Sequence, residues 1–121
     1  MYELIELDSF AKAFTKRLKL GRRNEEKVRQ GIVDELGENP YNGTPMKGVQ
    51  TVSGRKIHGL RHEKLGVANY RGGLVVLYRI CEECIRYGYH AKGGPKCQFC
   101  NPEITKRVVL FDIHPRGKDY G

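Results

Sequence analysis

The chain has 121 residues, with 22 Lys and Arg against 14 Asp and Glu, so its formal net charge is +8. This length predicts one domain over residues 1–121, and no apolar run approaches the ~20 residues that cross a bilayer, so we expect no membrane partner. The positive excess favours a polyanionic partner, such as nucleic acid, a ribosome or an acidic protein.

The first third of the chain predicts a short strand followed by two helices. Residues 2–7 form the strand. A first helix, which Asp8 or Ser9 caps and Gly21 ends, would bury one apolar face made of Phe10, Ala13, Phe14 and Leu18. A second helix, which Asn24 caps, would bury residues spaced four apart, Val28, Ile32 and Leu36. Together they predict a helical hairpin.

The remainder of the chain is β in character. Its apolar and β-branched runs predict strands at residues 55–61, 66–70, 74–80 and 107–113. The run 74–80 is apolar enough for a central strand, and Gly72-Gly73 before it predicts a hairpin turn or a bulge. The order of one strand, two helices and then further strands predicts an α+β fold, in which the helical hairpin packs on a small antiparallel twisted sheet.

All four cysteines fall in one window, residues 81–100, which lies between the last two predicted strands. Two Cys-x-x-Cys turns can bring four thiolates into the tetrahedron that zinc prefers. The window therefore predicts a zinc-binding insertion with one ion held by Cys81, Cys84, Cys97 and Cys100. Because the four ligands leave no open position, the zinc would be structural. His90 would be a ligand only by displacing a cysteine.

Two other uses of the cysteines are a pair of disulfides and a thioredoxin-like redox pair. Residues 1–4 lack the pattern of a secretory signal peptide, so we expect a cytoplasmic protein, in which disulfides are rare. A redox pair usually needs one Cys-x-x-Cys at a strand–helix junction, not two in tandem.

Short motifs lie along the chain on both sides of the cysteine window. They are Asn39-Pro40 with Met46-Lys47-Gly48, Lys56-Ile57-His58-Gly59-Leu60-Arg61, Tyr70-Arg71 with Val76-Leu77-Tyr78-Arg79-Ile80, and residues 109–120. In order and spacing they resemble the RelE/ParE toxin superfamily, small ribonucleases and gyrase poisons of toxin–antitoxin pairs. The chain departs from the family pattern where Gly72-Gly73 follows Tyr70-Arg71, where Pro115 separates His114 from Arg116, and in the cysteine window.

The resemblance implies a RelE-like fold and a metal-independent endoribonuclease that cuts ribosome-bound mRNA, with an antitoxin as its protein partner. Basic side chains can deprotonate the ribose 2′-OH, stabilise the phosphorane and protonate the leaving 5′ oxygen. The matching catalytic positions are His58, Arg71, His114, Arg116 and Tyr120. The matching RNA-binding positions are Lys56, Arg61 and Lys118. His58 or His114 would be the acid or base, Arg71 and Arg116 the phosphate clamps, and Tyr120 a base-stacking group or proton donor.

Other interpretations remain open for these residues. The chain would then be a non-catalytic basic zinc protein that binds RNA, DNA or the ribosome, or a ParE-like gyrase inhibitor. Arg61 and Arg79 would snorkel at the edge of the sheet, and residues 114–120 would be a solvated tail. Ring side chains of the cysteine window, Tyr87, Tyr89 and His90, would stack RNA bases or form the apolar floor of the zinc loop.

Overall fold

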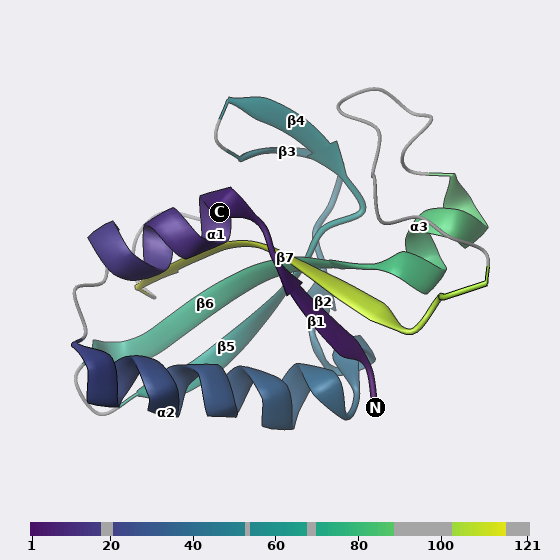
Figure 1. The fold of residues 1–121 in the computed structure, drawn as a ribbon. Coiled ribbons are helices and arrows are strands. Elements are labelled where there is room, and N and C mark those ends of the chain that lie inside the picture. The colour runs from purple at the N-terminus through teal and green to yellow at the C-terminus, as the bar shows by residue number, and fades with distance from the viewer. Residues whose placement is uncertain (18–20, 53, 68–69, 89–102, 116–121) are drawn as a thin grey trace.

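The computed structural model of the chain describes residues 1–17, 21–52, 54–67, 70–88 and 103–115 (Figure 1). The first half of the chain forms β1 (Glu3–Glu6), α1 (Asp8–Lys12), η1 (Ala13–Arg17), α2 (Arg22–Ile32), η2 (Val33–Gly37), η3 (Pro40–Asn42), β2 (Thr44–Pro45) and β3 (Val49–Val52). The second half forms β4 (Arg55–His58), β5 (Arg61–Val67), β6 (Tyr70–Ile80), α3 (Cys81–Tyr87) and β7 (Arg107–Pro115). The α+β class predicted from the sequence is confirmed.

The main sheet has five strands in the order β1-β7-β6-β5-β2. Strands β5, β6 and β7 pair antiparallel, as predicted, but β1 runs parallel to β7, with Glu3 opposite Arg107. The sheet is therefore mixed, and the prediction of an antiparallel sheet was wrong. The cause is a pairing between the first and the last strand, which no local periodicity reports.

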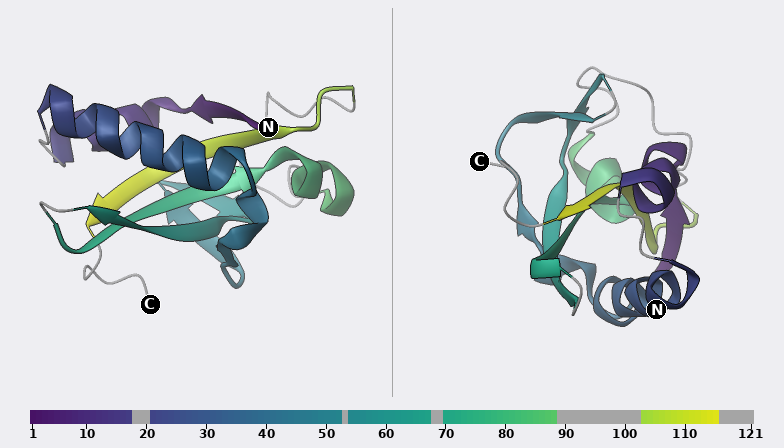
Figure 2. Two further views of the ribbon diagram at one scale, coloured as in Figure 1. Left: turned by 90° about the horizontal axis from the view of Figure 1, so that it is seen from below. Right: turned by 90° about the vertical axis from the view of Figure 1, so that its left-hand side faces the viewer.

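Helices α1 and α2, with their extensions η1 and η2, cover one face of the sheet (Figure 2). The second helix begins at Arg22, with Gly21 as its N-cap at φ 80°, so the prediction of Asn24 as the cap was wrong by three residues. A left-handed φ of this kind suits glycine because it has no Cβ. The helical segment runs on to Gly37, where η2 ends.

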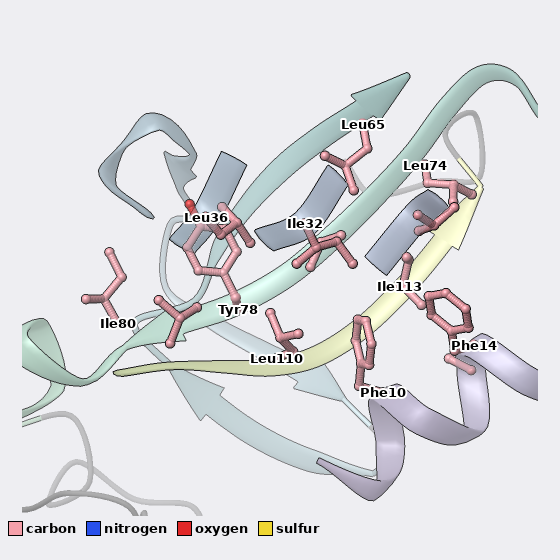
Figure 3. Close-up of a cluster of buried hydrophobic side chains, with 14 residues drawn as sticks. Phe10, Phe14, Ile32, Leu36, Leu65, Leu74, Tyr78, Ile80, Leu110 and Ile113 are labelled. Carbon is pink, nitrogen blue, oxygen red and sulfur yellow. The ribbon is translucent and has the colours of Figure 1, made fainter. Parts of the chain in front are cut away.

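The helices bury the apolar faces that their periodicity predicted (Figure 3). Phe10 and Phe14 pack with Val28, Ile32 and Leu36 against the sheet, and all five are at most 3% exposed. The sheet contributes every second residue of β6 to this cluster, namely Leu74, Val76, Tyr78 and Ile80. Leu18, which was predicted on the same face, lies outside the described residues.

Strand β6 begins at Tyr70, so Gly72 and Gly73 lie inside the strand and not in a hairpin turn. The pairing with β5 shifts register at this point, since Leu65 faces Leu74 while Val67 faces Tyr70. The bulge alternative is therefore correct.

Strands β3 and β4 form a separate two-stranded sheet, here called the basic hairpin (residues 49–58). The predicted strand over residues 55–61 is interrupted after His58 by Gly59, whose φ is 73°, and the chain resumes as β5 at Arg61. The buried Val52 and Ile57 of the hairpin, with Leu60 after it, pack on the sheet face opposite the helices. The sheet is thus covered on both faces (Figure 2).

Strand β7 carries a bulge, because Leu77 pairs with Asp112 while Tyr78 pairs with Leu110. The extra residue, Phe111, packs with the residues under the basic hairpin. A bulge resets the alternation of side chains along a strand. Asp112 and His114 therefore face the hairpin side of the sheet.

The Asn39-Pro40 motif docks the chain on β6. The Asn39 side chain accepts a hydrogen bond from the Tyr41 backbone N–H at 3.2 Å, and the Tyr78 hydroxyl donates to the Pro40 carbonyl at 2.5 Å. A Cβ at Gly43 would overlap the Tyr78 hydroxyl.

Within the described parts of the chain, no helix has the length and apolar character that crossing a membrane requires.

Candidate metal centre and nucleic-acid interface

The first Cys-x-x-Cys pair lies where β6 runs directly into α3. Ile80 is extended, at φ −95° and ψ 124°, and Cys81 is the first residue of the helix. Cys81 and Cys84 are both fully buried. Residues three apart on a helix lie on the same side, so the helix, rather than the predicted turn, aims both sulfurs in one direction.

Glu83, between the two cysteines, forms a bidentate ion pair with Arg61 of β5. The Arg61 Nε and Nη2 atoms donate to the two Glu83 oxygens at 2.7 and 2.8 Å, and Nη1 donates to the Gly43 carbonyl at 2.8 Å. The two side chains are 12% and 11% exposed. The hydrogen bond with Glu83 raises the pKa of Arg61. Arg61, a predicted RNA-binding residue, therefore anchors α3 to the sheet.

Glu82 also fastens α3 to the rest of the fold. Its carboxylate accepts hydrogen bonds from the Tyr2 hydroxyl and, at 3.2 Å, from the Tyr41 hydroxyl. Partial burial, together with the nearby Glu82 charge, raises the pKa of both tyrosines. Both glutamates of the Cys-Glu-Glu-Cys motif thus fasten the start of α3 to the body of the protein.

Arg79 connects this helix to the basic hairpin. Its Nε and Nη2 atoms donate to the His58 carbonyl at 3.0 and 2.5 Å, and its Nη1 atom lies 3.7 Å from the Cys84 sulfur. The guanidinium also lies over the Phe111 ring, 5.5 Å from its centroid. Arg79 is only 4% exposed, so the interpretation that it snorkels at the sheet edge was wrong.

The second half of the predicted zinc site, Cys97 and Cys100, lies outside the described residues, as do Tyr89 and His90. The described ranges contain no group of three or more metal-ligating side chains. The described pair fits a thiolate metal site in its chemistry, because two buried sulfurs share one side of a helix and a guanidinium borders one of them. Tyr87, at the end of α3, is 49% exposed with Arg86 against its ring.

The same geometry bears on the redox alternative. Cys81 and Cys84 do lie at a strand–helix junction, the position that a redox pair uses. Their complete burial disfavours that chemistry, because thiol–disulfide exchange needs an accessible thiolate.

The basic hairpin belongs to a segment free of acidic residues. Residues 39–62 contain four Lys or Arg and two His but no Asp or Glu. In β4, Lys56 and His58 lie two residues apart and on the opposite side from the buried Ile57. Lys56 is exposed and His58 half-buried, so these two predicted site residues come together on the outward side of the hairpin.

Among the other predicted site residues, the structure describes the side chains of Arg61, which pairs with Glu83, and of His114. His114 is 2% exposed, and its Nδ1 lies 3.0 Å from the Pro115 carbonyl oxygen. Arg71 lies in β6, but its side chain is outside what the structure describes. Arg116, Lys118 and Tyr120 follow the last described residue. With 2% of its surface exposed, the His114 ring is too buried in this arrangement to contact RNA.

Residues that sequence reasoning did not assign to the site are Arg79, Glu82 and Glu83. One signal was available for Arg79, since an arginine within the apolar run 74–80 must be buried and therefore needs partners. The partners of the two glutamates lie 22 to 80 positions away in the chain, and no spacing rule points to them. Comparison of the chain with protein-family models and with curated proteins finds no match.

Proposed function

We propose that the chain is a RelE-like endoribonuclease of the toxin type that cleaves mRNA, with a structural zinc ion in the cysteine window. The observation that carries this proposal is the outward pair of Lys56 and His58 on an acid-free basic hairpin. The element order also supports it, since a helical segment pair follows the first strand and antiparallel strands follow the helices. The same order underlies the resemblance to the family.

In this proposal His58 removes the proton from a ribose 2′-OH. The freed 2′ oxygen attacks the adjacent phosphorus, the bond from phosphorus to the 5′ oxygen breaks, and the products are a 2′,3′-cyclic phosphate and a 5′-OH end. Lys56 stabilises the negative charge of the phosphorane, and a second acid protonates the leaving oxygen. Tyr120 is the sequence candidate for that acid, and Arg71 and Arg116 are candidates for the phosphate clamps.

The zinc ion would be held by Cys81 and Cys84 of α3 together with Cys97 and Cys100. Bound zinc would tie the segment between β6 and β7 to the start of α3 and supply folding energy there. An antitoxin with acidic character would neutralise the protein by covering the basic hairpin. A small acidic protein encoded beside this chain would support such a pair.

The test is induced expression of the whole chain in cells, with mapping of new 5′-OH ends on mRNA. We expect the wild type to cause growth arrest and new 5′-OH ends. The double variant Lys56→Ala/His58→Ala should cause neither. Lys27→Ala on the exposed side of α2 is the matched control and should behave as the wild type. Absence of new ends with a folded wild-type protein would overturn the nuclease proposal.

The burial of His114 and the ion pair of Arg61 favour a second candidate, a non-catalytic basic zinc protein that binds RNA. Both residues are engaged inside the fold, which leaves fewer groups for catalysis. Salt-dependent RNA binding by the purified protein, with no cleavage under any condition, would favour this candidate.

A further inference from the structure

Arg79 lies where the sheet, the basic hairpin and the cysteine helix meet. It follows Leu77 and Tyr78 in β6, and its side chain contacts three other elements: the His58 carbonyl in β4, the Phe111 ring in β7 and the Cys84 sulfur in α3. One planar guanidinium therefore carries a mechanical connection between Cys84 and the strand that presents Lys56 and His58.

The hairpin depends on such connections for its position. It is a two-stranded sheet with no ladder to the main sheet, and an isolated two-stranded hairpin is marginally stable in water. Apolar packing under Val52 and Ile57 is non-directional. The bonds from Arg79 to the His58 carbonyl, in contrast, have a direction, and they define where the end of β4 lies.

The strength of the Arg79 connection depends on the state of the sulfur. A metal-bound cysteine is a thiolate, which accepts a hydrogen bond from a guanidinium as a charged partner, whereas a neutral thiol is a weak acceptor. Each thiolate ligand adds negative charge at a bound metal ion, which a bordering guanidinium partly balances. Metal binding would therefore hold Nη1 at Cys84 while Nε and Nη2 donate to the His58 carbonyl.

We propose that Arg79 is a positioning residue that couples zinc binding at Cys81 and Cys84 to the placement of the basic hairpin. Zinc loss would release the end of β4 and with it the outward pair of Lys56 and His58, so metal supply would regulate RNA binding. This inference rests on the proposed zinc site and RNA-binding function.

The experiment compares hydrogen exchange in β4 of the full chain, loaded with zinc and after chelation, with the metal content measured in each sample. In the wild type, chelation should speed exchange in β4 about tenfold, the effect of losing one charge-assisted hydrogen bond. In Arg79→Met, exchange should be fast already in the loaded protein, and chelation should add little. Zinc affinity of this variant should fall about tenfold.

Arg86→Met is the matched control, because Arg86 is an exposed arginine of α3, the helix that carries Cys81 and Cys84. It should keep the wild-type response to chelation. Arg79→Lys keeps the charge, but its single ammonium group cannot bond the His58 carbonyl and the Cys84 sulfur together. Hydrogen exchange in β4 of this variant should therefore change little on chelation. Arg79→Lys replaces Arg79→Met in the experiment if Arg79→Met does not fold.

Each outcome decides the proposal. An equal response to chelation in the wild type and the Arg79 variants would mean that Arg79 is merely structural. If the wild type is shown to have lost its zinc and hydrogen exchange in β4 does not change, the coupling is also overturned. The proposal of a zinc site would survive this result. A wild-type protein that binds no zinc would overturn both. RNA binding is measured separately, so its failure is distinguishable.

Discussion

Arg61 and Glu83 form two parallel hydrogen bonds, at 2.7 and 2.8 Å, between a strand of the sheet and the helix that begins with Cys81. Both side chains are almost buried. Arg61 also lies over the Tyr41 ring, 5.2 Å from its centroid, and donates to the Gly43 carbonyl. Arg61, which the sequence motifs assigned to RNA binding, thus anchors α3, the helix that carries Cys81 and Cys84. Its contribution can be measured as a change in the free energy of unfolding.

Arg61→Ala should lower the free energy of unfolding by about 2–3 kcal/mol, because it leaves the Glu83 carboxylate without its charged partner in a nearly buried position. Urea denaturation measures the change. The exposed pair of Arg29 and Glu6 is the control, with side chains 41% and 33% exposed, and Glu6→Gln should cost no more than about 1 kcal/mol. Equal costs at both sites would contradict the structural role of Arg61.

His114→Ala should destabilise the protein by about 2–3 kcal/mol, since it removes a buried ring from the sheet face under the hairpin. Cleavage per folded molecule should persist, provided that the assay is run well below the melting temperature. Thermal unfolding and cleavage are measured on the same sample. A stable His114→Ala protein that has lost all cleavage would contradict this prediction and indicate that His114 takes part in catalysis.

Lys56→Ala should weaken RNA binding without unfolding the protein, because Lys56 is exposed on the hairpin. The salt dependence of binding should fall by about one unit of slope, the signature of one lost phosphate contact. Filter binding over a range of salt concentrations measures it. Lys27→Ala, on α2, should leave the slope unchanged, and a slope that falls equally in both variants would place RNA elsewhere.

The full chain should bind one zinc ion, and Cys81→Ser and Cys97→Ser should each abolish stoichiometric binding, because a tetrahedral site lacking one thiolate holds zinc weakly. Elemental analysis of the purified protein gives the ratio of zinc to protein. Tyr87→Ala, a change at an exposed position of α3, should keep the metal. Full zinc content in Cys97→Ser would show that the second cysteine pair does not contribute.

Tyr78 should make stability fall at alkaline pH. Burial raises its pKa above the ordinary value of 10.0, so the unfolded chain loses this proton first, and stability that is complete below pH 10 is lost as the pH rises further. Tyr78→Phe should cost about 1 kcal/mol near neutral pH through its lost bond to Pro40, and it should lose less stability than the wild type between pH 8 and 11. Urea midpoints at these pH values measure both effects. Identical pH profiles for the two proteins would contradict the prediction.

Elements with a local signal could be predicted from the amino-acid sequence alone. The spacing of Val28, Ile32 and Leu36 predicted the buried face of α2, because one helical turn brings such residues to one side. The apolar run 74–80 predicted a central strand, because both of its faces need apolar cover, and β6 lies between β7 and β5. The cysteine spacing likewise predicted a zinc site that stays a prediction.

Contacts between residues far apart in the sequence depend on how the elements pack in three dimensions. The parallel pairing of β1 with β7, the contact of Arg61 with Glu83 and the reach of Arg79 to His58 and Cys84 all join separate elements. Such contacts follow from how the elements pack, and the bulge at Phe111 changes which residues of β7 face the hairpin. Local periodicity carries no record of these choices, so His114 read as a candidate catalyst in the sequence and lies buried in the fold.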